Sequence, residues 1–455
     1  MRIEEELKLA GYFWLPSSPN KQIPGNLSIL DGGKIELEII GLFDELPEEF
    51  NEIINIDRVV GHVEKLGYVT LDKCFYKKKN LPFQGIAKSL LHVHRAFEGV
   101  GLVDGYEPLF SSFRFSIDGL DEWVGRSGIK VEQLYEERSA NITYKQLEET
   151  SINLLNGMKL SISFSWKLPG FPVLSEAKIT QRTFLRLESS DKVPLGDFIS
   201  LAHKITTLVS FAVDNNVSLN SVYATIADDS DKKDAVRVIY QSLPYSKDKP
   251  KIEWHNMLFR FGQFGDNAEL MINNWLEAYE NIDPSLNLYF STKTGVYKYL
   301  DGKFLALAQG LETYHRRTSN ETLMPEDEFN DLIGHIVGSC PDEHKKWLSG
   351  RLMHGNEINL GKRIKSIISP FKDTIGTSRE RNKFIRKIVD TRNYLTHYNE
   401  ALKDSYPTGK ELWLLCNKME AIFQLHFLQV IGFSNNEIKN IIINNNKLRD
   451  KVSKI

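Results

Sequence analysis

Apolar and polar residues alternate in short segments through the first half of the chain. Strict alternation at 160–164, Leu-Ser-Ile-Ser-Phe, has the period of a half-buried strand. Similar segments occur at 27–30, 34–43, 58–76, 111–120, 159–168 and 179–189, separated by turn sequences such as Pro-Gly. The pattern predicts a β-rich, sandwich-like N-terminal domain, interrupted by one helix that begins after Pro194.

The period becomes helical in the second half. A charged stretch with two prolines at 244–251 offers little to bury, so we place a linker there and divide the chain into domains 1–250 and 251–455. Helices are predicted at 267–282, 296–317, 326–339, 343–354, 359–369 and 409–431, and the polar residues after them are predicted to fray. The predicted class is therefore α+β multidomain, with a C-terminal all-α bundle.

One further helix begins at Thr377. Its hydroxyl can cap the helix, and Glu380 three residues later completes a capping box. The segment is rich in cations, and Arg379, Arg381, Lys383 and Arg386 are candidate RNA-binding residues. A merely solvated charged face is an equally good interpretation of this run.

Composition limits where nucleic acid could bind. The net charge is -3 and the pI is near 6.4, so any RNA contact must be local. Cys74, Cys340 and Cys416 lie far apart, which favours neither disulfides nor a metal knuckle and suits a reducing cytoplasm. Neither an export signal nor an apolar run long enough to span a membrane is recognisable, so we expect a cytoplasmic protein.

The strongest chemical motif is Arg-Asn-Tyr-Leu-Thr-His at 392–397, an R-x4-H spacing. Asn393 and His397 would share one helix face, and Arg392 is one step round the helix, so we expect the three groups to converge. An imidazole can transfer protons near neutral pH, and a guanidinium can stabilise a crowded phosphorane. These are the groups that RNA cleavage needs without a metal or another cofactor, and a homodimer would supply the second histidine.

The spacing alone is weak evidence. With 19 arginines and 11 histidines, chance supplies about one match to the wider R-x4–6-H pattern, and the chain holds one. Its context, a basic capped helix followed by a long apolar helix, is what favours a functional site. The alternative without a function is that Arg392 is a surface ion-pair partner. His397 would then be a histidine that the helix macrodipole favours at the C-terminus of the helix.

The helical part resembles the HEPN family of metal-independent ribonucleases through RNYLTH at 392–397 and, less specifically, ALAQGLETYHRR at 306–317. The whole chain resembles the ApeA type of bacterial anti-phage protein, in which a β-rich N-terminal domain precedes a HEPN domain, here with its core at about 296–435. The resemblance implies a homodimer or a higher even oligomer with a composite site. It implies Arg392 and His397 as the catalytic pair, Asn393 as a supporting residue and Glu312 as an acid that orients Arg392.

The resemblance also implies the biological setting. RNA is the implied substrate, with tRNA among the candidates, and a phage protein is the implied trigger, sensed by the N-terminal domain in abortive infection. Two other functions stay open: a non-catalytic sensor or scaffold whose HEPN fold dimerises or binds a nucleotide, and a β-type binding domain with a helical dimerisation tail.

Other histidines carry weaker hypotheses. His92 and His94 alternate on one expected strand, but without an evident third ligand a metal site is disfavoured. His315 and His354 are expected to be solvated or capping residues.

Overall fold

The computed structural model describes residues 1–43, 55–80, 85–102, 107–171, 174–227, 235–398 and 400–453. These residues form two compact units, Met1–Asn273 and Asn274–Ile455. Each unit is considered by itself below.

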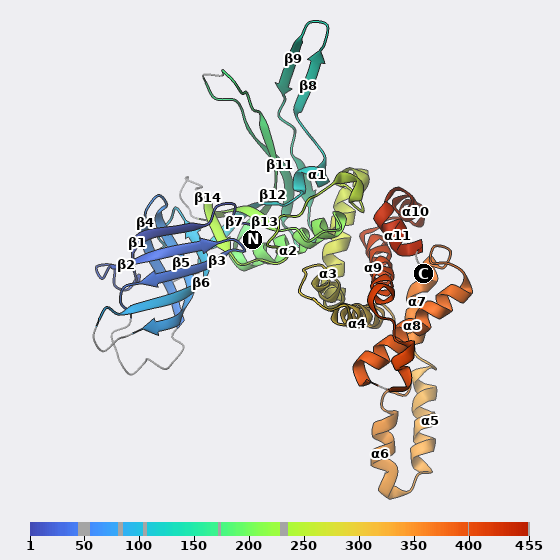
Figure 1. Ribbon diagram of the computed structural model, residues 1–455. Helices are drawn as coiled ribbons and strands as arrows, with labels where there is room; N and C mark the ends of the chain where they lie inside the picture. Colours follow the sequence, from blue (N-terminus) through green and yellow to red (C-terminus); the bar gives the residue numbers. More distant parts are fainter. Residues whose placement is uncertain are drawn as a thin grey trace. The chain divides into compact units, whose positions relative to one another are not determined.

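The first unit is built mainly from strands (Figure 1). They are β1 (Leu7–Trp14), β2 (Ile23–Leu30), β3 (Lys34–Ile39), β4 (Asn55–Val63), β5 (Gly67–Asn80), β6 (Lys88–Glu98), β7 (Leu109–Ile117), β8 (Ile129–Leu134), β9 (Ser139–Tyr144), β10 (Thr150–Asn153), β11 (Lys159–Lys167), β12 (Thr180–Pro194), β13 (Leu219–Ile226) and β14 (Ala235–Tyr240). The helices among the described residues of this unit are α1 (Leu120–Val124), α2 (Leu195–Ala212) and the short 3-10 segments η2 (Trp254–Asn256) and η3 (Phe261–Asn267).

The first six strands close into a ring in the order β6-β3-β2-β1-β4-β5, because β5 also pairs with β6. Strand β6 is shared between two parts of the sheet. Its residues 89–93 pair with β3, its residues 95–98 pair with β14 on the same edge, and β5 occupies the other edge. From β14 the sheet continues through β13, β7, β12, β11 and β10. The described strands therefore form a ring that continues into a sheet, in place of two face-to-face sheets. The alternation of apolar and polar residues shows which side of a strand is buried, but it does not show which strand is the neighbour.

Helix α2 covers the extended sheet. The helix predicted after Pro194 is confirmed, its apolar residues Phe198, Leu201, Ile205, Leu208 and Phe211 are buried, and the ring of Phe198 stacks on Phe113 of β7 with centroids 6.0 Å apart. The segment expected to be a linker is held in this unit, because Arg2 donates hydrogen bonds to the carbonyl oxygens of Ser246 and Lys247. The boundary between the compact units accordingly lies later in the chain, at Asn273.

The second unit is helical. Its elements are α3 (Ala268–Ser291, which begins in the first unit), α4 (Leu300–Thr318), α5 (Glu326–Gly338), α6 (Asp342–Leu352), α7 (Leu360–Ile368), η4 (Ser369–Phe371), α8 (Ser378–His397), η5 (Glu400–Ser405), α9 (Gly409–Ile431), α10 (Asn435–Asn444) and α11 (Asn446–Ser453). The β-rich region followed by a helical region, as predicted, is confirmed. No helix among the described residues has the length and apolarity needed to cross a membrane.

Helix α9 is the centre of this unit and is buried along most of its length. Gly310 of α4 lets the two helices approach, since a Cβ there would lie 2.9 Å from Cζ of Phe423. The carboxylate of Glu420, also on α9, is buried among three lysines from outside this helix: Lys293, Lys303 and Lys451. The last of these belongs to α11, so the prediction of a fraying tail was wrong: the tail forms two helices, with Leu448 and Val452 of α11 buried.

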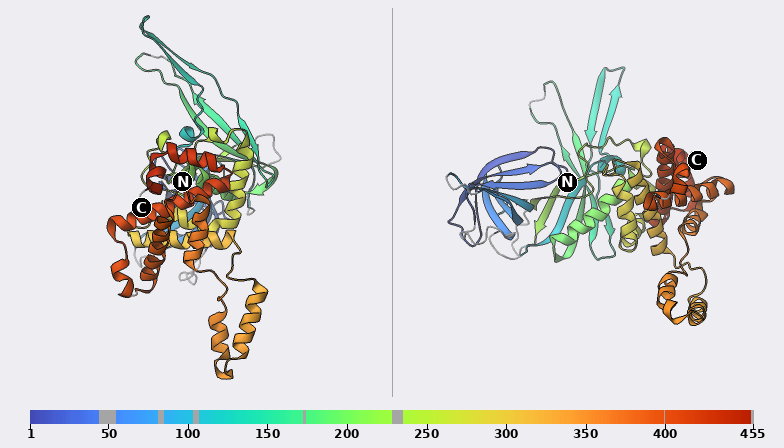
Figure 2. Two further views of the ribbon diagram at one scale, coloured as in Figure 1. Left: turned by 90° about the vertical axis from the view of Figure 1, so that its right-hand side faces the viewer. Right: turned by 60° about the horizontal axis from the view of Figure 1, so that its bottom comes forward.

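Helices α5 and α6 form a hairpin that projects from the other helices of the second unit (Figures 1 and 2). Neither helix contains a buried residue. The two ends of the hairpin segment meet, because Thr322 pairs with Glu357 in a single antiparallel bridge and the N–H of Leu323 donates to the carbonyl oxygen of Asn356 at 2.9 Å.

Candidate nuclease site

Helix α8 carries the R-x4-H motif, and its ends are fixed locally. The predicted capping box is present, with the Thr377 N–H donating to Oε2 of Glu380 at 2.7 Å and the Glu380 N–H donating back to the Thr377 hydroxyl at 3.4 Å. The helix ends at His397 because Tyr398 adopts a left-handed conformation, with φ of 48°. The ring of Tyr394 stacks on Tyr406 with centroids 4.7 Å apart, which anchors the chain after the helix.

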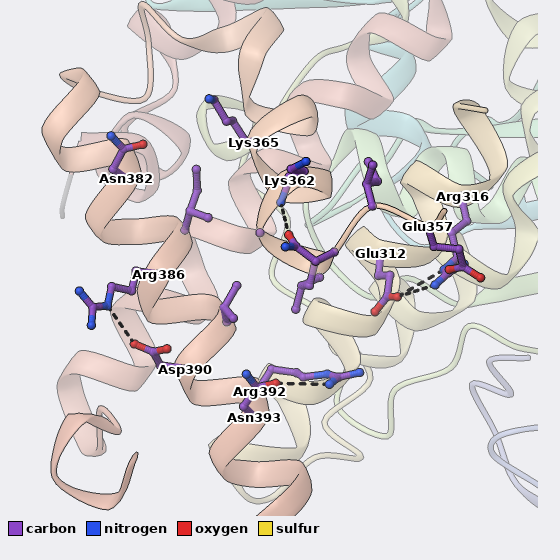
Figure 3. A pocket seen from close by; sticks show the side chains of 16 residues that line it. Glu312, Arg316, Glu357, Lys362, Lys365, Asn382, Arg386, Asp390, Arg392 and Asn393 are labelled. Atoms are coloured by element: carbon purple, nitrogen blue, oxygen red, sulfur yellow. Dashed lines mark hydrogen bonds and ion pairs between the residues drawn. The ribbon is translucent and has the colours of Figure 1, made fainter. Parts of the chain in front are cut away.

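Two adjoining cavities lie beside this helix. The larger, of about 790 Å³, is lined by α4, α7, the residues before α7, and α8 (Figure 3). The smaller, of about 480 Å³, lies between α4 and α8. Both are lined by Glu312, Arg316, Leu360 and Arg392, so Arg392 stands where the two cavities meet.

Arg392 and Asn393 come together in this site. Both line the larger cavity, and Nη1 of Arg392 donates a hydrogen bond to Oδ1 of Asn393 at 3.4 Å. Figure 3 shows the Arg392 side chain extending towards Glu312 and Arg316. Arg392 is half-buried, and among the described residues it has no carboxylate within ion-pair distance. Its guanidinium is therefore available to an anion that enters the cavity.

His397 lies elsewhere. It is exposed at the end of α8 and is not among the residues that line either cavity. Each residue of an α-helix adds about 100°, so five steps place His397 about 140° round the helix from Arg392. The expected convergence of three polar groups within one chain is therefore reduced to two, Arg392 and Asn393.

Glu312 lines both cavities, but its Oε1 accepts hydrogen bonds from Arg316 at 3.1 and 3.3 Å. Arg316 also forms an ion pair with Glu357, whose Oε2 lies 2.5 Å from Nη1. Hydrogen bonds from Arg316 outweigh the effect of burial and hold the pKa of Glu357 below its ordinary value. Glu312 and Glu357 thus hold Arg316 between them, and all three line the same cavity as Arg392.

The charges around the larger cavity favour an anion. Its five cations are Arg316, Lys362, Lys365, Arg386 and Arg392, and its three carboxylates are Glu312, Glu357 and Asp390. Every one of these carboxylates is already in an ion pair with an arginine. The unpaired charge that remains is positive, as a phosphate site requires.

Two family models match the chain. Residues 8–275, more than half of the chain, match the model described as ApeA N-terminal domain 1, and residues 305–437 match the model described as Apea-like HEPN. The chain belongs to the ApeA family. It is therefore an anti-phage defence protein with a C-terminal HEPN module, and the resemblance recognised in the sequence is confirmed. No curated protein and no solved structure matches it.

The four candidate RNA-binding residues of the HEPN domain have different surroundings. Arg386 lines the larger cavity, where its Nε lies 3.5 Å from Oδ2 of Asp390. Arg381 is occupied by the backbone, donating to the carbonyl oxygens of Lys372 and Gly376. Arg379 is exposed and lines neither of the two cavities, and Lys383 lines a separate cavity against α9. Arg381 points to the other side of the helix from Lys383, since two steps turn an α-helix by about 200°. Arg379, Lys383 and Arg386, at spacings of four and three, lie on one side of the helix but face different neighbours.

His315 does not fit its prediction as a solvated or capping residue. It is 3% exposed, and Nη1 of the buried Arg363 lies 3.2 Å from its Nδ1. Burial and the nearby Arg363 lower its pKa, so the ring stays neutral and accepts from the guanidinium. Arg363 also forms an ion pair with Glu357 at 3.3 Å. His315 therefore holds Arg363 next to Glu357, which lines the larger cavity.

His354 is exposed, as predicted, with Nδ1 3.0 Å from Oε1 of Glu357. On β6, His92 packs against the ring of Phe75 at a centroid distance of 4.9 Å. The described residues contain no group of three metal-ligating side chains, around His92 and His94 or elsewhere.

Sequence reasoning missed Arg316, Glu357, Lys362 and Lys365 as residues of the cavity. Arg316 lay within the segment that carried the HEPN resemblance, four residues after Glu312, and this spacing predicts an ion pair on one helix face. The other three come from the start of α7 and the residue stretch before it. No spacing within that segment relates them to α8.

Proposed function

We propose that the HEPN domain is a metal-independent RNA endonuclease that acts in abortive infection. The observation that carries this proposal is Arg392, half-buried where two cavities meet, hydrogen-bonded to Asn393 and without a carboxylate partner among the described residues. HEPN domains commonly bind RNA and dimerise, which agrees with a net positive cavity.

The proposed reaction is attack by a ribose 2′-oxygen on the adjacent phosphorus. A base removes the 2′-hydroxyl proton, the bond from phosphorus to the 5′-oxygen breaks, and that oxygen receives a proton. The products are a 2′,3′-cyclic phosphate and a 5′-hydroxyl. In this scheme His397 transfers the protons, Arg392 binds the phosphorane oxygens, and Asn393 positions the Arg392 guanidinium.

The two reacting groups come from different subunits in this proposal. One α8 presents Arg392 and His397 on sides about 140° apart, so a single chain does not bring them to one phosphate. A two-fold dimer that sets two α8 helices against one another would bring His397 of the partner subunit to Arg392. Such a dimer contains two equivalent composite sites.

A mixing experiment tests the composite site. The Arg392→Ala and His397→Ala variants are expected to be inactive alone, but a heterodimer of the two contains one site with both groups. Random exchange makes half of the dimers mixed, each with one of two sites intact, so the mixture is expected to regain about a quarter of the parental cleavage rate. Differently tagged chains allow the mixed dimers to be purified and assayed. Purified mixed dimers without activity would rule out this arrangement.

RNA is the proposed substrate, with tRNA among the candidates, and the N-terminal domain is proposed to sense a phage protein and release the nuclease. The direct test incubates the full chain with total RNA in EDTA, with and without extract from phage-infected cells, and maps the cleaved ends. Cyclic phosphate ends support the mechanism above. Cleavage that depends strictly on added magnesium contradicts it.

Arg386 is expected to contribute to RNA binding through the larger cavity. In a His397→Ala background, Arg386→Ala should weaken RNA binding about three- to tenfold and reduce the slope of log Kd against log salt by about 1, because one phosphate contact is lost. Arg379→Ala is the matched control, since Arg379 is an exposed cation of the same helix that lines neither cavity, and it should change Kd by less than about twofold. Equal effects of the two substitutions would mean that the cavity does not bind RNA.

The second candidate is a non-catalytic sensor or scaffold. The observation that favours it is the separation of His397 from the cavity of its own chain. A scaffold would protect cells from phage equally well with and without His397, whereas a nuclease would not.

A further inference from the structure

A third cavity lies between α8 and α9, away from the nuclease site. It has a volume of about 260 Å³ and is lined by Lys383, Phe384 and Lys387 of α8 and by Glu411, Leu414, Leu415 and Lys418 of α9. It shares no lining residue with the larger cavity. The residues of α8 that line the two cavities lie on different sides of that helix, so this is a separate site.

Lys418 is the unusual residue of this cavity. Its side chain is 3% exposed, and among the described residues its Nζ has no hydrogen-bond partner. Its Nζ lies over the ring of Phe384, 5.4 Å from the ring centroid. Buried ammonium groups in proteins are almost always paired, so an unpaired one calls for a partner that is not part of the chain.

The surrounding charges do not supply that partner. Oε2 of Glu411 lies 3.2 Å from Nζ of Lys387, so these two charged groups are paired with each other. The Glu380 carboxylate acts on Lys418 only from beyond ion-pair distance. Burial, opposed by this carboxylate, lowers the pKa of Lys418 to about 8. Lys383 and Lys418 are left as two ammonium groups without a carboxylate within 4 Å among the described residues.

The ligand chemistry follows from these groups. Two unpaired ammonium groups match a doubly charged anion, and three of the lining side chains, Phe384, Leu414 and Leu415, offer an apolar wall beside it. The volume is below that of most drug-sized pockets, which range over about 300–1,000 Å³, so the ligand must be small. We propose that this cavity binds a small dianion of the phosphate type, with Lys418 and Lys383 as its direct ligands.

Sulfate is the best first probe, because it stays a dianion across the pH range in which Lys418 titrates. A bound dianion raises the pKa of Lys418. At a pH of about 8.5, anion binding is therefore accompanied by the uptake of, on average, less than one proton per site. Calorimetric titration of the full chain with sulfate, in two buffers of different ionisation enthalpy, should therefore show binding with proton uptake. A lack of saturable binding at sulfate concentrations up to about 10 mM would overturn the proposal.

Variants test which groups hold the anion. Lys418→Met should weaken binding by about tenfold or more, and Lys418→Arg, which stays charged, should keep binding but lose the proton uptake. Lys383→Ala, a surface change that does not disturb the core, should weaken binding up to about fivefold. Lys410→Ala is the control, since Lys410 is an exposed lysine of α9 outside the cavity. If both Lys418→Met and Lys383→Ala bind sulfate with unchanged affinity, the anion binds elsewhere and the proposal is wrong.

The source of the dianion can be distinguished in the same assay. Phenyl phosphate carries an apolar ring beside the same charged group, so tighter binding than inorganic phosphate would indicate a phosphorylated small molecule that uses the apolar wall. Equal or weaker binding of phenyl phosphate would indicate the free inorganic anion as the ligand.

Discussion

Replacing His397 with alanine should lower RNA cleavage by about 10²- to 10⁴-fold, because positioned proton transfer contributes a factor of this size. His397 is exposed and outside the helical core, so the free energy of unfolding should stay within about 0.5 kcal/mol of the parent. Arg392→Ala should cost about 10²- to 10³-fold through the loss of electrostatic stabilisation. Arg392→Lys should recover only part of this loss, because it keeps the charge without the planar fork.

Cleavage is measured with the RNA and trigger that activate the parent, under single-turnover conditions, and phage protection is scored in cells. His344→Ala is the matched control, since His344 is an exposed histidine of α6 that pairs with a carboxylate and lies outside the cavities. It should behave as the parent does. Parental activity in both His397→Ala and Arg392→Ala would leave the scaffold function as the better explanation.

The largest effect on stability is expected from Glu420→Gln. Glu420 is 3% exposed, and its carboxylate is paired with Lys293, with Lys303 at 3.3 Å and with Lys451 at 2.6 Å. Glutamine keeps the shape but removes the charge that three lysines share, so the free energy of unfolding should fall by about 3–5 kcal/mol, as when one member of a buried ion pair is lost. Urea unfolding of the second unit, monitored in the full chain, measures the change.

Glu411→Gln is the control for this substitution, because Glu411 lies on the same helix but is exposed and pairs with one lysine. Its effect should not exceed about 0.5 kcal/mol. If Glu420→Gln costs no more than Glu411→Gln, the lysine cluster does not stabilise the bundle.

The same cluster predicts a dependence on pH. Burial alone would favour the neutral acid, but Lys293, Lys451 and Lys303 outweigh it and hold the pKa of Glu420 below its ordinary value of 4.5. A depressed carboxyl pKa contributes stability that is fully present above the unfolded pKa and is lost as the pH falls towards the folded pKa. The stability difference between the parent and Glu420→Gln should therefore be constant above about pH 5 and shrink below about pH 4.

Helices with local signals could be predicted from the sequence, and their partners could not. Thr377 and Glu380 marked the start of α8, and Ser434 with Glu437 is the same capping signal for α10, although the polar composition of the tail concealed it. In the sequence, Glu420 only interrupts an otherwise apolar stretch. Its lysines lie 127, 117 and 31 residues away in the chain, and no local pattern connects residues at such separations.

The candidate site shows the same limit. Arg392 and Asn393 were found from spacing and do lie together, and helical geometry alone already separates Arg392 from His397. The spacing could not predict the wall of the cavity opposite α8. Arg316 of α4, Glu357 before α7 and Lys362 of α7 provide that wall. That wall forms only when the helices pack together. It contains Arg316, which donates to Glu312, whereas we predicted that Glu312 would orient Arg392.

The bridge between Thr322 and Glu357 has a consequence for how this family can vary. Because the chain leaves and re-enters the bundle at adjacent points, everything between them behaves as an insertion closed at its base. Closing a longer loop costs little extra free energy, so this segment can lengthen, shorten or change its sequence while α4 and α7 keep their places. Relatives are thus free to diversify the α5–α6 hairpin without altering the chemistry beside it.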